Sequence, residues 1–127
     1  VASPEEIIPA SYLAAAYLKS RNVSVAFVIG SAGLRDELAL FGIETASVEG
    51  TVDMTNEEIS AYVLDERIEA VVVGHTSAFS YRELAVATQY LRKGDVELVG
   101  TNPDAADRLP GSRWMPGTGA LLAAVEA

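Results

Sequence analysis

Residues 23–34 read VSVAFVIGSAGL, and this stretch decides the fold. Val23–Ile29 is a nearly continuous apolar run of strand length, which is typical of a strand buried on both faces of a parallel sheet. Gly30 ends the run, and Ser31 stands where the N-cap of a following helix is expected. Three apolar residues mark one face of that helix: Leu34, Leu38 and Phe41. The stretch therefore predicts a βα unit.

The same succession of strands and helices continues on both sides of this unit. A helix is expected over about 10–20. Capping boxes at Thr55–Glu58 and Ser80–Glu83 mark the starts of two later helices, because each pairs a hydroxyl with a glutamate three residues on. Further strands are expected over 43–48, 68–73 and 96–99. No linker or repeat interrupts the pattern.

Strands that alternate with amphipathic helices predict an α/β fold with a mainly parallel sheet. Right-handed crossovers would place helices on both faces, in a Rossmann-like arrangement of three layers. A chain of 127 residues is of the length of one domain. We therefore expect residues 1–127 to form a single α/β domain.

The composition narrows the class of protein. A net charge of −9 is opposite to the balance usual in nucleic-acid-binding proteins and argues against binding to a membrane surface. The absence of cysteine excludes disulfides and Cys-based zinc sites. No apolar run is long enough to span a membrane, and no signal-peptide pattern opens the sequence. We expect a cytoplasmic protein that binds neither nucleic acid nor membrane.

Three predicted strands end in glycine followed by a small or polar residue: Gly30-Ser31, Gly74-His75 and Gly100-Thr101. Ligands of parallel α/β sheets bind beyond the carboxyl ends of the strands, although a glycine there also simply permits a turn. Gly30–Gly33 lacks the spacing of a dinucleotide fingerprint. The single histidine, His75, has no triad or metal-site partner at a recognisable spacing. We assign no catalytic and no metal-binding residue to the chain.

The longest segment without a predicted element is 102–117. It contains Asp107, Arg108, Arg113 and Trp114. A guanidinium suits a phosphate or carboxylate, and neighbouring Arg and Trp residues are typical of binding sites. The alternative is a solvated loop that Trp114 anchors to the domain. Sequence alone leaves both interpretations open.

Several stretches, taken in order, resemble the phosphatases of the haloacid dehalogenase superfamily, in the branch of p-nitrophenyl phosphatase, phosphoglycolate phosphatase and pyridoxal phosphatase. They are IIPASYLAAAYL (7–18), VIGSAGL (28–34), AVVVG (70–74), FSYREL (79–84), VGTNPD (99–104) and PGTGALLAAVE (116–126). The resemblance covers nearly the whole chain. Its order and spacing, rather than any one stretch, make it specific.

This resemblance implies a division of labour between two domains. In the family, a core domain holds an aspartate nucleophile within Asp-x-Asp-Gly-Thr and the ligands of Mg²⁺, and neither motif is present here. The chain is thus expected to be the α/β cap, with short stubs of core near 1–12 and 116–127, and to be inactive alone. The implied reaction is hydrolysis of phosphate monoesters through an aspartyl-phosphate, with Mg²⁺ bound by the parent enzyme and no cofactor on this chain.

The resemblance also implies partners and substrate contacts. The expected partners are a small phosphorylated substrate and the catalytic core of the same polypeptide, and a homodimer through the cap is compatible with the family. The segment 105–115 matches the family's specificity loop in position, so Asp107, Arg113 and Trp114 are expected to bind substrate.

Two alternatives to the cap function remain: a Rossmann-like nucleotide-binding module at Gly30–Gly33, and a homodimerisation domain.

Overall fold

A computed structural model describes residues 10–48, 55–74, 76, 79–101, 106–109, 113–116 and 118–126. Helices and strands alternate along most of the chain, as the sequence predicts. The elements are α1 (Ala10–Ser20), β1 (Val25–Ile29), α2 (Ala32–Leu40), β2 (Glu44–Ala46), α3 (Asn56–Ala61), β3 (Ala70–Val73), α4 (Tyr81–Arg92), β4 (Glu97–Gly100), β5 (Ala106–Leu109), β6 (Arg113–Pro116) and α5 (Thr118–Glu126). None of the described helices is long and apolar enough to cross a lipid bilayer.

The main sheet has four strands in the order β2-β1-β3-β4, and every pairing in it is parallel. The central strands β1 and β3 are buried along their whole length, whereas β2 and β4 at the two edges are only partly buried. This is the burial expected when helices cover both faces of a parallel sheet. The predicted α/β fold with a mainly parallel sheet is confirmed.

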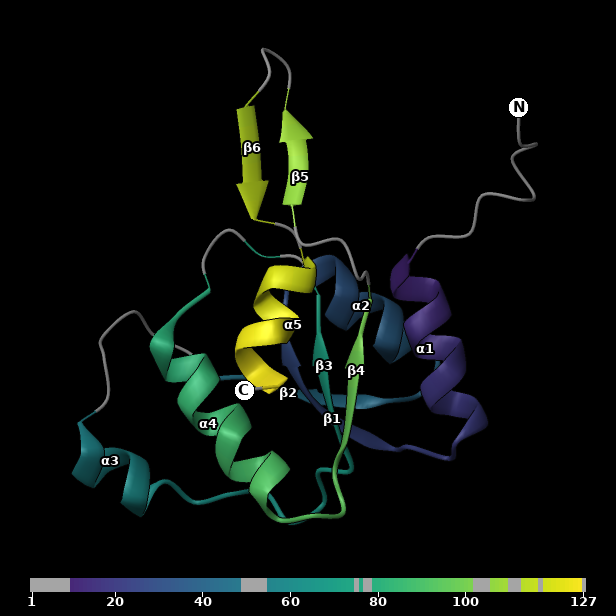
Figure 1. Cartoon of the computed structure of the whole chain (residues 1–127). Coiled ribbons are helices and arrows are strands. Elements are labelled where there is room, and N and C mark those ends of the chain that lie inside the picture. Colours follow the sequence, from purple (N-terminus) through teal and green to yellow (C-terminus); the bar gives the residue numbers. More distant parts are fainter. Residues whose placement is uncertain are drawn as a thin grey trace.

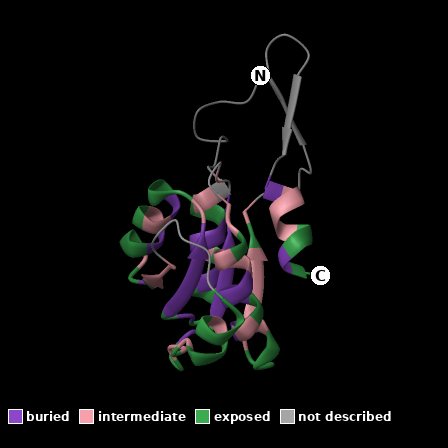
Figure 2. Cartoon of the chain, turned by 90° about the vertical axis from the view of Figure 1, so that its left-hand side faces the viewer, coloured by how far each residue is buried: buried purple, intermediate pink, exposed green. Residues whose placement is uncertain are grey.

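Helices lie on both faces of the sheet, α1 and α2 on one and α4 and α5 on the other (Figure 1). Because neighbouring residues of a strand project to opposite faces, β1 contributes to two cores. Val28 packs with Leu18 and Leu38 on the first face. Phe27 packs with Tyr90 on the second, their ring centroids 5.2 Å apart. Figure 2 shows these buried residues concentrated in the strands and on the inner sides of the helices.

Both predicted capping boxes are present. In α3, the Thr55 hydroxyl accepts a hydrogen bond from the Glu58 amide at 3.1 Å, and the Glu58 carboxylate accepts one from the Thr55 amide at 3.2 Å. Ser80 and Glu83 repeat the arrangement at the start of α4, with both distances 3.1 Å. Ser31 occupies the predicted N-cap position of α2, but its side chain makes no capping hydrogen bond.

We expect Ser80→Ala to lower the free energy of unfolding by about 1 kcal/mol, because the Glu83 amide loses its acceptor. Thr88→Ala is the matched control in the same helix, since the Thr88 hydroxyl only bonds back to the Leu84 carbonyl. That change should shift stability by less than about 0.5 kcal/mol. Urea denaturation followed by circular dichroism measures both values. Equal losses in the two variants would contradict a capping role for Ser80.

The expectation of an irregular segment over 102–117 is wrong. β5 and β6 lie within it and pair antiparallel, forming a second, two-stranded sheet. Each strand has only four residues, and Ala106, Asp107 and Pro116 are of types that are depleted in strands. The pairing of backbone amides and carbonyls does not depend on those side chains, so a hairpin forms where the side-chain pattern gives no strand signal.

Candidate functional site

The carboxyl ends of the parallel strands meet at one edge of the sheet, and the β5–β6 hairpin extends beyond that edge (Figure 1). α5 also begins there, at Thr118, and contacts both strands of the hairpin as well as β3 and β4. Thr118 is a polar residue with only 3% of its surface exposed. Because ligands of parallel α/β sheets bind at this edge, it is the place to look for a site.

The side chain of Leu34 fills the centre of this edge. The strand order changes direction between β1 and β3, which is where nucleotides bind in doubly wound folds. A Cβ atom added to Gly30 or Gly74 would lie 2.9 or 2.6 Å from the Leu34 Cδ2 atom. Leu34 is 4% exposed, and both glycines therefore serve its close packing. This packing does not favour the alternative of a nucleotide-binding module at Gly30–Gly33.

Gly100, the glycine at the end of β4, packs against a leucine from the other face of the sheet. A Cβ atom on Gly100 would lie 2.6 Å from the Leu122 Cδ2 atom of α5. Val125, one turn further on, is 5% exposed and belongs to the same core as α4. The glycine thus lets α5 approach the end of β4 closely, and α5 connects the hairpin to the sheet.

The register of the hairpin places the candidate binding residues. Asp107 pairs with Met115, Arg108 with Trp114, and Leu109 with Arg113. Directly paired residues belong to the same face of a sheet, and neighbours along a strand alternate between faces. Asp107 and Arg113 therefore occupy one face, and Trp114 occupies the other. Two of the three predicted residues are brought together, and the third is not.

The sequence-based assignment left out Arg108, which lies on the same face of the hairpin as Trp114 because the two are paired. In the sequence, the two are six positions apart within a segment that shows no strand pattern. The Leu109-Pro110-Gly111 run between them was the available signal of a turn, since Pro-Gly pairs commonly mark one.

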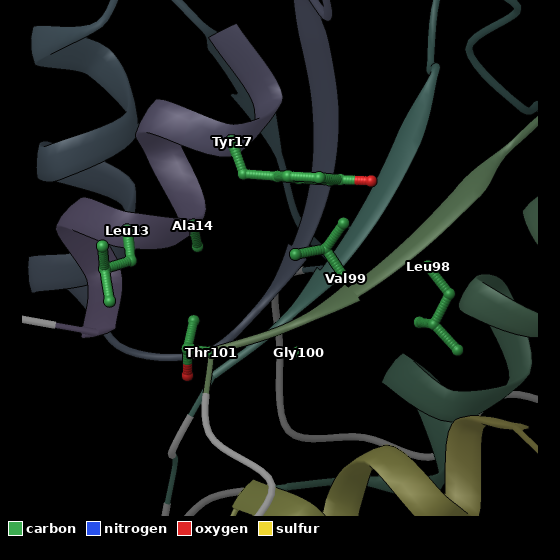
Figure 3. A pocket seen from close by; sticks show the side chains of 7 residues that line it. All are labelled: Leu13, Ala14, Tyr17, Leu98, Val99, Gly100 and Thr101. Carbon is green, nitrogen blue, oxygen red and sulfur yellow. The ribbon is translucent and has the colours of Figure 1, made fainter. Parts of the chain in front are cut away.

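A pocket of about 360 Å³ opens between α1 and the edge strand β4 (Figure 3). Its lining is Leu13, Ala14, Tyr17, Leu98, Val99, Gly100 and Thr101. The Tyr17 hydroxyl donates a hydrogen bond of 2.6 Å to the Glu97 Oε1 atom, and Arg21 Nε pairs with Oε2 at 3.1 Å. The hydrogen bond to Glu97 is the main cause of a raised pKa of Tyr17. Most of its lining side chains are apolar, so the pocket can hold an apolar group.

Other residues of interest are outside this region or outside the described residues. His75 and Asn102–Asp104 are not among the described residues, so their interpretation rests on sequence alone. Within the described part of the chain, no three acidic, histidine or cysteine residues gather as they would around a metal ion. The described edge of the sheet offers shape and contacts, without an assembled catalytic centre.

Comparison with known proteins finds relatives among phosphatases. Glycerol-3-phosphate phosphatase of Rattus norvegicus is 38% identical over 128 residues, which cover 95% of this chain and 40% of that protein. A mutant of thermostable p-nitrophenylphosphatase from Bacillus stearothermophilus matches the fold with a TM-score of 0.72 at 29% identity, covering 98% of this chain and 42% of that one. The chain is homologous to part of the haloacid dehalogenase superfamily phosphatases. The resemblance inferred from sequence is confirmed.

A further haloacid dehalogenase phosphatase shares the fold alone. The glycerol phosphate phosphatase of Mycobacterium tuberculosis, in complex with magnesium, has a TM-score of 0.73 at 23% identity over 99% of this chain and 34% of that one. No family model matches the chain. The chain spans about 40% of the length of the first curated relatives it matches. It is therefore a phosphatase-related region.

Proposed function

We propose that the chain is the substrate-specificity cap of a Mg²⁺-dependent phosphatase that hydrolyses phosphate monoesters through an aspartyl-phosphate. The main support for this proposal is the 38% identity to glycerol-3-phosphate phosphatase of the rat across 95% of the chain. Residues 1–127 would form one cap domain, with stubs of the core near 1–12 and 116–127.

In this proposal the reacting groups belong to a core domain of the same polypeptide. Phosphoryl transfer of this kind needs a carboxylate nucleophile and a metal ion that neutralises the phosphoryl oxygens. The described residues do not gather as Mg²⁺ ligands. The magnesium complex of the mycobacterial phosphatase supports Mg²⁺ as the metal of the parent enzyme.

The contribution of this chain would come from the hairpin. β5 and β6 extend from the carboxyl edge of the sheet, where a cap can cover the mouth of an active site and contact the leaving group of the substrate. Such a cover excludes water and makes charged contacts stronger. Asp107, Arg113 and Trp114 are the candidate contacts, and their division between two faces bears on which of them reach the substrate.

Exchange of the hairpin tests this function. In the polypeptide that joins this chain to its core domain, residues 106–116 are replaced by a short Gly-Ser linker, and kcat/KM is measured for a panel of phosphate monoesters. We expect hydrolysis to persist while the order of preference among the esters changes. Unchanged relative kcat/KM values across the panel would refute the specificity role. A polypeptide that hydrolyses no ester, even before the exchange, would refute the phosphatase assignment.

A homodimer through the cap is a second part of the proposal. Tyr12 and Leu13 of α1 are 44% and 52% exposed, and they lie on the helix that borders the edge strand β4. Apolar side chains beside an unpaired strand edge favour contact with another chain. Sedimentation velocity over a wide concentration range tests it. A monomer at every concentration would remove homodimerisation from the proposal.

A further inference from the structure

Among the described helices, α3 alone has no buried residue. Its residues are exposed apart from Ile59, which is half-buried. The helix lies outside α4, away from the sheet (Figure 1). A space of about 300 Å³ remains between the two helices, and its lining includes Ile59 of α3 and Leu84 and Ala85 of α4. Little apolar packing therefore holds α3 to the domain.

The hydrogen bonds of α3 are local. The Ile59 amide donates to the Thr55 carbonyl at 3.0 Å, and the Tyr62 amide donates to the Ile59 carbonyl at 3.2 Å. The capping box adds two bonds between Thr55 and Glu58 at the other end. Isolated helices shorter than about 12–15 residues are marginal in water, and α3 has six residues. Its own bonds are therefore expected to break often.

The chain is anchored to the domain again directly after α3. The backbone becomes extended at Tyr62, and the side chains of Tyr62 and Leu64 pack against the second core. The Asp65 amide donates a hydrogen bond of 3.1 Å to the Tyr90 hydroxyl of α4. Ile68, just before β3, is 3% exposed. A movement of α3 can therefore end at Tyr62 without disturbing the sheet.

We infer that α3 is a flap, hinged at Tyr62, that opens from α4 and closes on it while the four-stranded sheet stays folded. Proteins open locally where few apolar contacts hold a segment, at a lower free energy than global unfolding. The inference does not depend on the proposed function. Opening uncovers the residues of α4 that line the space, which are all uncharged: Tyr81, Leu84, Ala85, Thr88 and Gln89.

Hydrogen exchange of the chain tests this, followed for each amide by NMR at several low urea concentrations. The Ile59 and Tyr62 amides should be protected at least about a hundredfold less than the amides of β3. Their exchange should hardly respond to urea, because the opening of α3 exposes little surface, whereas exchange in β3 should rise steeply. Equal protection in α3 and β3, with the same urea dependence, would overturn the inference.

The two capping boxes of the chain provide a matched pair of variants. Thr55→Ala and Ser80→Ala each remove the hydroxyl that accepts a backbone amide at the start of a helix. Thr55→Ala should speed exchange of the Ile59 and Tyr62 amides by about fivefold and leave the urea midpoint of the domain unchanged. Ser80→Ala should lower that midpoint, because α4 unfolds together with the sheet. A similar decrease in both variants would mean that α3 unfolds only with the whole domain, and the flap would be refuted.

Discussion

Replacing Leu38 by alanine is expected to lower the free energy of unfolding by about 3–5 kcal/mol. Leu38 is fully buried on α2 and packs in the core shared with Leu18 of α1 and Val28 of β1. Removal of its methyl groups leaves a cavity that the surrounding helices and strands cannot fill completely, which adds to the loss of buried apolar surface. Domains are typically stable by about 5–15 kcal/mol, so this one change removes a large share of the total.

Leu40→Ala is the control, because it is the same substitution two residues further along the same helix, at a residue that is 80% exposed. We expect it to change stability by less than about 0.5 kcal/mol. Urea denaturation of the chain, followed by circular dichroism, compares the two. A single cooperative transition is expected in each case. Similar losses in both variants would mean that α2 does not pack on the sheet through Leu38.

The parts of the fold that the sequence predicted are those with local causes. Val25–Ile29 could be assigned because a strand buried on both faces needs apolar residues at every position. Ser80 and Glu83 could be assigned because a capping box involves residues only three positions apart. These signals do not depend on distant parts of the chain, and together they were sufficient for the α/β class and the parallel sheet.

The parts that it did not predict depend on contacts between distant segments. Arg108 and Trp114 are opposite each other in the antiparallel register of the hairpin, and the two strands have no alternating apolar pattern in the sequence. The packing of Leu34 against Gly74 joins residues forty positions apart. From the sequence, a glycine at a strand end was compatible with a ligand site but favoured an ordinary turn, and the position of Leu34 now accounts for Gly30 and Gly74 through packing.

For the candidate site, the sequence indicated a segment but not its geometry. Asp107, Arg113 and Trp114 were chosen for their chemistry, and their role in substrate binding stays a prediction. The register shows that they are divided between two faces, which residue spacing alone cannot reveal without knowledge of the strand pairing. Because of this division, substrate binding by Asp107 and Arg113 and substrate binding by Trp114 become two separate predictions, one for each face of the hairpin.

We expect the chain by itself to hydrolyse no p-nitrophenyl phosphate in the presence of Mg²⁺. An aspartyl-phosphate mechanism needs a free carboxylate next to a bound metal ion. Several described carboxylates already form hydrogen bonds or ion pairs with other side chains. Glu97 accepts the hydrogen bond of Tyr17 and pairs with Arg21. Glu44 and Asp65 both pair with Arg67, at 2.6 and 2.8 Å, and the hydrogen bonds from Arg67 lower the pKa of Asp65.

The measurement compares the chain with the polypeptide that includes its core domain, at equal concentration and with Mg²⁺ present. Phosphate monoesters hydrolyse extremely slowly without a catalyst, and enzymes accelerate this reaction by up to about 10²¹-fold. The longer polypeptide should therefore release p-nitrophenol readily, and the chain should match the blank. A contaminating phosphatase is recognised because its activity separates from the chain on a second chromatography column. Metal-dependent turnover that follows it quantitatively would mean that this segment contains a catalytic centre, and the cap function would have to be abandoned.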